Sequence, residues 1–183
     1  MRKIKSTLAI IIGVILLFSC NNAQSPGRGN EPLSTNKVIQ QPDGSIALHV
    51  NKAGSYRDKK NPSINTAEWN IEISKSGRFD VWLSSATTDT TDLGYKNKVL
   101  LNIHNNVLEI QPVVNKVVKN TSEVESPYFK TDSFMGAMYI QDTGLYLVQI
   151  ISDKILPEDI HDANERITEK TKLLSVTLTP AIR

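Results

Sequence analysis

Alternation of apolar and polar residues runs through most of this chain and constrains its fold more than any other feature. The pattern is clearest over Ile46–Val50, Trp69–Ile73 and Phe79–Leu83, where every second residue is apolar. A period of two places the apolar side chains on one face of an extended strand, so each segment is predicted to be a half-buried β-strand. Further strands are predicted over Val99–His104, Val107–Val113, Ala137–Gln141, Leu145–Ser152 and Leu174–Leu178.

Short turn signals separate the predicted strands. Ser74–Gly77, Asn105-Asn106 and Asp142–Gly144 carry the Gly, Asn and Asp residues that tight turns need. The polar segment Pro157–Lys172 fits either a short helix or a solvated loop. We therefore predict an all-β domain over residues 45–183, a jelly-roll β-sandwich of about eight to nine strands.

The first twenty residues have the pattern of a secretory signal. Arg2, Lys3 and Lys5 precede an uncharged apolar run that ends at Phe18, and Ser19 and Cys20 follow it. The run fits the apolar stretch of about 7–15 residues in such signals and is shorter than the ~20 residues of a membrane span. This arrangement resembles bacterial lipoproteins, which implies that residues 1–19 are a cleaved signal peptide and that Cys20 is lipidated. A membrane helix, or a secreted protein with an unrelated cysteine, is the alternative.

Residues 20–44 are predicted to be a flexible linker between the lipidated cysteine and the sandwich. The segment is rich in Asn, Gln, Ser, Pro and Gly and has no hydrophobic period. Within it, Val38 and Ile39 could form a short edge strand. The residues Asn21–Gln24 include no acidic pair, which favours attachment to the outer membrane of a Gram-negative bacterium with the domain facing the periplasm.

The net charge and the cysteine content limit which partners and metals the chain is expected to bind. The net charge of +2 becomes −1 when the three basic residues of the signal are removed, so the mature chain has no basic excess for binding nucleic acid. With one cysteine, which the lipid would occupy, and three histidines, we expect no disulfide and no transition-metal site.

Four segments resemble the galactose-binding-like jelly rolls, among them the family 6 and 35 carbohydrate-binding modules and the C-terminal modules of sulfatases and fucosidases. They are Ala67–Ile73, Gly77–Ala86, Gly136–Leu147 and Leu173–Pro180. The resemblance implies a sandwich fold and non-catalytic glycan binding.

The resemblance also raises the question of calcium, which many of these modules hold with acidic residues on their first and last strands. Here Ile46–Val50 and Leu174–Thr179 contain no carboxylate, and calcium needs six to eight oxygen ligands. We expect no cofactor, with Asp89 and Asp92 as the alternative calcium ligands.

The candidate ligand-binding residues are aromatic and planar polar side chains in predicted loops or on an outward strand face. They are Tyr56, Arg57, Trp82, Asp92, Tyr95, Tyr128 and Phe129. Flat aromatic faces and planar polar groups hold sugars, and the family sites lie in end loops or on one sheet face. The alternative for Trp82 is packing beneath a loop or the linker, and for each tyrosine it is a loop anchor whose hydroxyl bonds to backbone.

No catalytic sequence motif is present, and Glu72 and Asp80 are interpreted as strand residues, with Glu72 pairing with Arg78. We expect a lipid-anchored, non-catalytic carbohydrate-binding protein of the cell envelope. The alternative is a structural or protein-interaction lipoprotein with an envelope protein as its partner, and a small hydrolase is a third hypothesis. Clustered aromatic residues would favour glycan binding, whereas an exposed apolar patch or strand edge would favour a protein partner.

Overall fold

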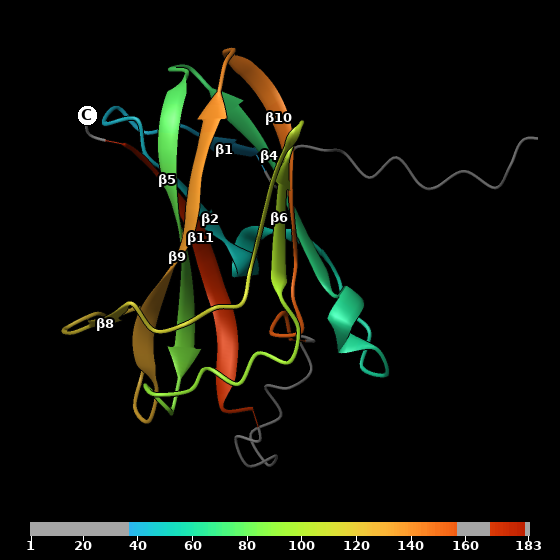
Figure 1. Cartoon of the computed structure of the whole chain (residues 1–183), viewed down its shortest axis with the longest axis vertical. Helices are drawn as coiled ribbons and strands as arrows, with labels where there is room; N and C mark the ends of the chain where they lie inside the picture. Colours follow the sequence, from blue (N-terminus) through green and yellow to red (C-terminus); the bar gives the residue numbers. More distant parts are fainter. Residues whose placement is uncertain (1–36, 157–168, 182–183) are drawn as a thin grey trace, which may run out of the picture. The chain divides into compact units, whose positions relative to one another are not determined.

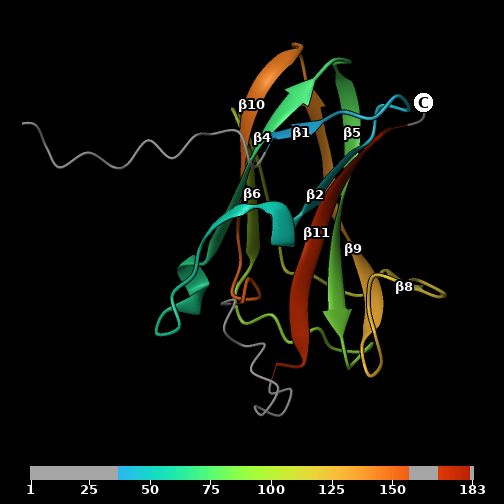
Figure 2. The same ribbon diagram turned by 180° about the vertical axis from the view of Figure 1, so that it is seen from behind.

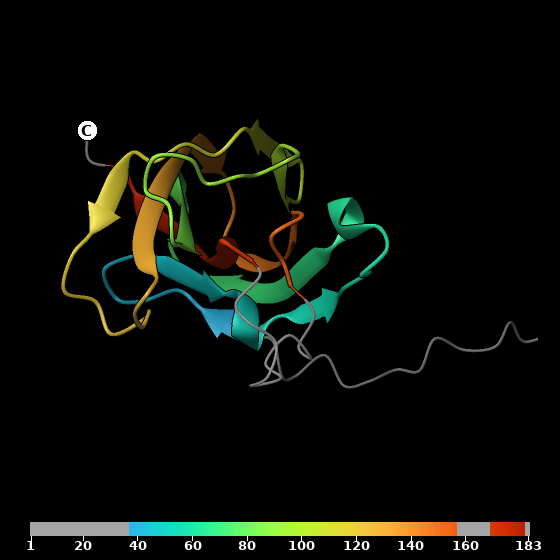
Figure 3. The same ribbon diagram turned by 90° about the horizontal axis from the view of Figure 1, so that it is seen from below.

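Two β-sheets pack face to face in the computed structural model, which describes residues 37–156 and 169–181 (Figure 1). Sheet A has the strand order β1-β4-β10-β6-β7, with β3 also paired to β4, and sheet B has the order β2-β11-β5-β9-β8. Seen from below, the sheets form the two layers of a sandwich (Figure 3). The all-β jelly-roll prediction is therefore confirmed.

The strands differ widely in length. Sheet A contains β1 (Lys37–Ile39), β3 (Gly54–Tyr56), β4 (Thr66–Ile73), β6 (Val99–Ile103), β7 (Asn106–Ile110) and β10 (Gly144–Ile151). Sheet B contains β2 (Ile46–His49), β5 (Gly77–Thr87), β8 (Lys116–Val118), β9 (Phe129–Ile140) and β11 (Thr171–Pro180). The remaining elements of the described ranges are two short 3₁₀ turns, Val50–Lys52 and Pro62–Ile64. None of the helices found in these ranges is long and apolar enough to span a membrane.

Eleven strands in the described residues exceed the eight to nine that were predicted. The additional ones are mainly three-residue edge strands, which are too short to display a period. The first part of β9 was missed for another reason, because the inward residues Thr131 and Ser133 are polar and fully buried. The Ser133 hydroxyl donates to the carbonyl of Val113 at 2.6 Å, which offsets the cost of burying it.

Two of the predicted turns connect different sheets. The turn after Ile73 leads from β4 in sheet A to β5 in sheet B, and the turn after Ile140 leads from β9 in sheet B to β10 in sheet A. The predicted pairing of Glu72 with Arg78 is therefore wrong, and Glu72 forms an ion pair with Lys37 at 2.7 Å. Of the three predicted turns, only the one between β6 and β7 is a hairpin within one sheet.

The inward faces of both sheets form one apolar core. Every second residue of β4 is buried. Trp69 of β4 and Phe79 of β5 are the largest fully buried side chains of the core. The indole N–H of Trp69 donates to the carbonyl of His49 at 3.1 Å, which links β4 of sheet A to β2 of sheet B. Figure 2 shows β2 and β11 side by side in sheet B.

Residues 37–44, which the sequence analysis assigned to the linker, are part of the sandwich. The strand β1 runs parallel to β4, with Val38 opposite Ile71, so Val38 and Ile39 lie in the short edge strand that they could form. The buried Gln40 follows it, and its amide nitrogen donates to the carbonyls of Gly44 and Lys75 at 2.8 and 3.2 Å. Its amide oxygen accepts from the backbone N–H groups of Ser74 and Lys75 at 2.9 and 2.7 Å.

Several sequence predictions concern residues outside the described ranges. These are the signal peptide, the lipidated Cys20, most of the linker, and residues 157–168 of the segment predicted as a helix or a loop. The last two residues of that segment, Thr171 and Lys172, begin strand β11.

Candidate functional site

Two aromatic side chains contact each other on the outer face of sheet B. Along β5, Val81 and Leu83 point into the core, so Trp82 between them points outward. Trp82 lies opposite Phe134 of β9, with the ring centroids 5.0 Å apart and the ring planes at 52°. Trp82 is half-buried and Phe134 is 42% exposed. The pair is therefore partly open to solvent.

A second group of outward side chains, with one aromatic ring and two charged groups, lies farther along the same face. Arg78 and Asp80 share the outward side of β5 with Trp82, and Tyr139 is the neighbour of Arg78 on β9. The Tyr139 side chain is 54% exposed. Within residues 37–156 and 169–181, the side chains of Arg78 and Asp80 form no hydrogen bond or ion pair. Their polar groups are therefore available to a ligand.

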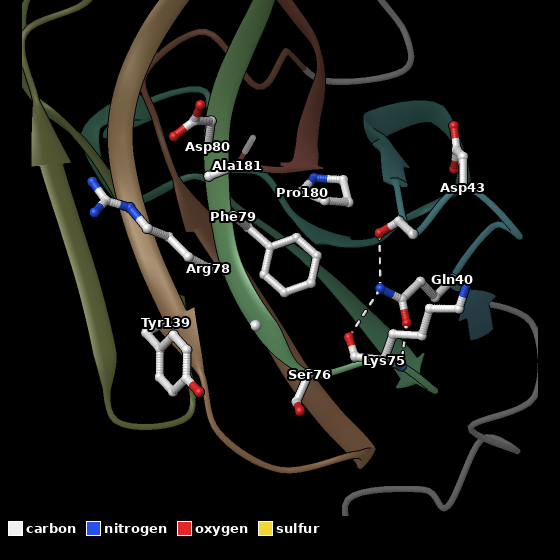
Figure 4. A pocket seen from close by; sticks show the side chains of 12 residues that line it. Gln40, Asp43, Lys75, Ser76, Arg78, Phe79, Asp80, Tyr139, Pro180 and Ala181 are labelled. Atoms are coloured by element: carbon white, nitrogen blue, oxygen red, sulfur yellow. Dashed lines mark hydrogen bonds between the residues drawn. The ribbon is translucent and has the colours of Figure 1, made fainter. Parts of the chain in front are cut away.

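This second group borders a surface hollow of about 910 Å³ (Figure 4). Figure 4 shows Arg78, Asp80 and Tyr139 on one side of the hollow and Gln40, Asp43 and Lys75 on the other. The residues of the second side bind within and between the turn after β1 and the turn after β4. Lys75 donates to the carbonyl of Pro42 at 2.7 Å, and Asp43 accepts from the backbone N–H and the hydroxyl of Ser45. These bonds from Ser45 hold the pKa of the Asp43 carboxyl below its usual value.

We refer to Arg78, Asp80, Trp82, Phe134 and Tyr139 as the outer-face row. It combines three aromatic rings with a guanidinium and a carboxylate on one sheet face. Aromatic faces bury the apolar side of a flat ligand, and planar polar groups accept or donate hydrogen bonds at its edge. The row can therefore bind a ligand that has both apolar faces and many hydroxyl groups.

Of the seven predicted residues, only Trp82 belongs to the outer-face row. Tyr56 is 58% exposed at the end of β3 in sheet A, with Arg57 next to it, and Phe129 is exposed at the start of β9 in sheet B. Tyr128 is a loop anchor, since its hydroxyl donates to the carbonyl of Glu169 at 2.9 Å. The structure does not bring these loop residues into the same row as Trp82.

The prediction that Tyr95 binds a ligand is wrong. It is 7% exposed and belongs to the core, and its hydroxyl lies 2.7 Å from that of Ser85. Leu93 and Tyr95, both from the loop after β5, belong to the hydrophobic core. A ring enclosed in this way cannot stack on a sugar, so Tyr95 is a structural residue.

Burial raises the pKa of Tyr95, so the contribution of this residue to stability depends on pH. The folded protein favours the neutral phenol, so this contribution to stability is complete below the unfolded-chain pKa of about 10. It is lost as the pH rises from there toward the folded-state pKa, by up to about 1.4 kcal/mol per pH unit. We expect Tyr95→Phe to lose less unfolding free energy between pH ~9 and ~11 than the unsubstituted protein, as measured by urea unfolding. An equal loss in both, or the same relief in the exposed control Tyr56→Phe, would contradict this role.

Asp89 and Asp92, the alternative calcium ligands, bind the backbone of their own loop. Asp89 accepts from the hydroxyl and the N–H of Thr91 at 2.6 and 2.9 Å, and these bonds lower its pKa. Asp92 accepts from the N–H of Gly94 at 2.8 Å. In the part of the chain that the structure describes, no three His, Cys, Asp or Glu side chains come together as metal ligands. The expectation of no cofactor stays a prediction, and calcium at this loop stays its alternative.

Four members of the outer-face row were not selected from the sequence. Arg78 and Asp80 alternate with core residues of a predicted strand, so their outward direction could have been read from the period. Phe134 and Tyr139 share a face because of a register shift opposite Val81 and Trp82. The extra residue, Met135, turns into the core. A bulge of this kind interrupts the period and hides the shared face.

No family model and no curated protein matches this sequence. Among solved structures, the α-L-fucosidase from Vibrio sp. strain EJY3 is similar over 81% of this chain and 24% of that enzyme, with 19% identity and a TM-score of 0.61. The GH26-CBM35 β-(1,4)-mannanase of Podospora anserina matches 77% of this chain and 28% of its own, with 14% identity and a TM-score of 0.46. The CBM35 from Cellvibrio japonicus Abf62 matches 75% and 94%, with 12% identity and a TM-score of 0.38.

These similarities concern the fold. The chain spans about a quarter of the length of the fucosidase and of the mannanase. The chain has a jelly-roll β-sandwich fold that is similar to one part of the fucosidase.

Proposed function

We propose that this protein is a lipid-anchored, non-catalytic carbohydrate-binding protein of the bacterial cell envelope and that the outer-face row binds the glycan. The proposal rests on the partly exposed Trp82–Phe134 pair, which shares one sheet face with the exposed ring of Tyr139. A pyranose ring has apolar C–H faces and a rim of hydroxyl groups. The aromatic rings suit the faces, and the unpaired side chains of Arg78 and Asp80 suit the hydroxyl groups.

The non-catalytic part of the proposal is supported by the composition of the row. Glycoside cleavage usually requires two carboxylates on either side of the scissile bond, and Asp80 is the single carboxylate among the five residues of the row. The fold similarity to about a quarter of an α-L-fucosidase is compatible with an accessory role beside carbohydrate-active enzymes.

The anchoring part of the proposal is supported by the sequence. The apolar run ending at Phe18 and the single Cys20 resemble a lipoprotein signal, and several acyl chains on one residue give stable membrane attachment. We propose that the mature protein starts at Cys20 and is attached to the outer membrane of a Gram-negative bacterium, facing the periplasm.

A protein-binding role is the second candidate function. It is favoured by four exposed aliphatic side chains on the opposite sheet, sheet A: Ile39, Val107, Leu145 and Leu147. Exposed apolar surface of this kind can mark a protein interface. The two candidate sites lie on different sheets, so substitutions can separate them.

Trp82→Ala tests the glycan proposal. We expect it to lower the affinity for a bound glycan at least tenfold, about 1.4 kcal/mol, because the ligand loses one aromatic face. The measurement is affinity electrophoresis and a glycan array on residues 20–183, with Cys20→Ser in every variant to prevent acylation. Leu147→Ala is the matched control on sheet A and should leave the affinity unchanged. Unchanged binding in Trp82→Ala, or loss in the control, would rule out this row as the site.

A further inference from the structure

The outer-face row has two separate aromatic platforms. Trp82 and Phe134 form the first, and Tyr139 beside Arg78 forms the second. Arg78 and Trp82 are four residues apart on β5, so the platforms are separated by roughly 13 Å at about 3.3 Å per residue. One sugar ring cannot contact both platforms, whereas several consecutive units of an extended chain can.

The surface between the platforms is low and polar. Asp80 lies there, with Ala137 beside it on β9 and Thr179 beside it on β11. Neither neighbour is large enough to rise between the two platforms. The Asp80 carboxylate makes no bond to another described residue, so it can accept from the hydroxyl groups of a sugar unit that bridges the platforms.

The row is also not enclosed like a pocket for a single terminal sugar. At one end, Tyr139 and Arg78 border the hollow of about 910 Å³. Beyond Trp82, the next outward residue of β5 is Ser84, whose hydroxyl donates to the carboxylate of Asp132 at 2.7 Å. Ser84 and its neighbour Ser175 on β11 are buried, so the open part of the row runs from Trp82 to the hollow. Sites that select one small ligand usually bury most of its surface in a concave pocket, whereas the exposed rings of Phe134 and Tyr139 lie along a sheet face.

We infer that the outer-face row binds several consecutive units of a linear, extended polysaccharide, with one platform under each end of the bound stretch. This inference rests on the proposed function and specifies its ligand. The backbone chemistry that fits is a β-1,4-linked chain of pyranose units with equatorial substituents, because such chains are extended and present flat C–H faces along their length.

The test is calorimetric titration of residues 20–183, carrying Cys20→Ser, with cello-, manno- and xylo-oligosaccharides of one to six units. We expect the affinity for one series to rise at least tenfold between the shortest and the longest oligosaccharides. Tyr139→Ala should reduce the affinity for long oligosaccharides to that for short ones and leave the short ones unchanged. Tyr56→Ala is the control, since Tyr56 is a similarly exposed tyrosine that lies on sheet A.

The outcomes separate the inference from the proposed function. If a monosaccharide binds as tightly as the longest oligosaccharide and Trp82→Ala abolishes both, the extended-chain inference is overturned and the carbohydrate-binding function stands. An equal effect of Tyr139→Ala on short and long ligands would also overturn it. If no oligosaccharide binds, and soluble glucomannan and xylan do not retard the protein in a gel, the carbohydrate-binding function itself is overturned.

Discussion

Trp69→Ala is expected to lower the free energy of unfolding by about 3–5 kcal/mol. Trp69 is fully buried in β4 and belongs to the core between the two sheets. Alanine would leave a cavity that the surrounding strands of a sandwich cannot easily close. It would also remove the indole donor to the carbonyl of His49, and losing the partner of a buried polar group adds to the cost. Urea unfolding followed by far-ultraviolet circular dichroism measures the change.

Trp82→Ala provides the matched comparison for Trp69, since the chain has two tryptophans. The half-buried Trp82 contacts the partly exposed ring of Phe134, and aromatic pairs of this kind contribute about 0.5–1.5 kcal/mol beyond area burial. We therefore expect a much smaller loss of stability than for Trp69→Ala. Equal losses would mean that Trp82 mainly supports the fold, and its availability for a ligand would then be contradicted.

Gln40→Ala is expected to destabilise the domain by about 2–3 kcal/mol, which would lower the melting temperature by roughly 5–10 °C. The buried amide of Gln40 connects the turn after β1 to the turn between β4 and β5, through bonds to Gly44, Ser74 and Lys75. Alanine would leave backbone groups of both turns without a partner. Differential scanning calorimetry measures the change.

Gln41→Ala is the control for Gln40. The amide of Gln41 makes an exposed bond of 3.3 Å to the carbonyl of Ile39, and exposed substitutions of this kind usually change stability by less than about 0.5 kcal/mol. If the two variants have the same melting temperature, the amide network of Gln40 does not hold the two turns in place.

The period of two predicted the sandwich but did not indicate to which of the two sheets each strand belongs. Alternation tells which side chains point inward, and a turn such as Ser74–Gly77 is compatible with a hairpin or with a connection between sheets. The structure has the second arrangement, which places Glu72 and Arg78 on different sheets. The inward Thr131 and Ser133 hid much of β9, because polar core residues look like solvent-facing ones in a sequence.

The candidate site was predicted only through Trp82. Its two aromatic neighbours in the row, Phe134 and Tyr139, come from β9, whose first part was not predicted and whose period is shifted by a bulge. Tyr95 shows the opposite error, because a tyrosine in a polar loop was expected to be exposed. Its burial depends on the path of the loop after β5, which local sequence does not specify.

The parallel pairing of β1 with β4 determines how the domain would respond to tension on the chain that precedes β1, as under the proposed lipid anchoring. Three residues, Lys37–Ile39, pair with Asn70–Glu72 in the same direction, so a pull directed back along β1 loads their hydrogen bonds in shear. Detaching β1 would release about 10 Å of slack while the longer strands of the core stay paired. The load would then reach Gln40, whose bonds to two turns form the next barrier. Under the proposed anchoring and glycan binding, the domain would in this way lengthen under strain before it unfolds.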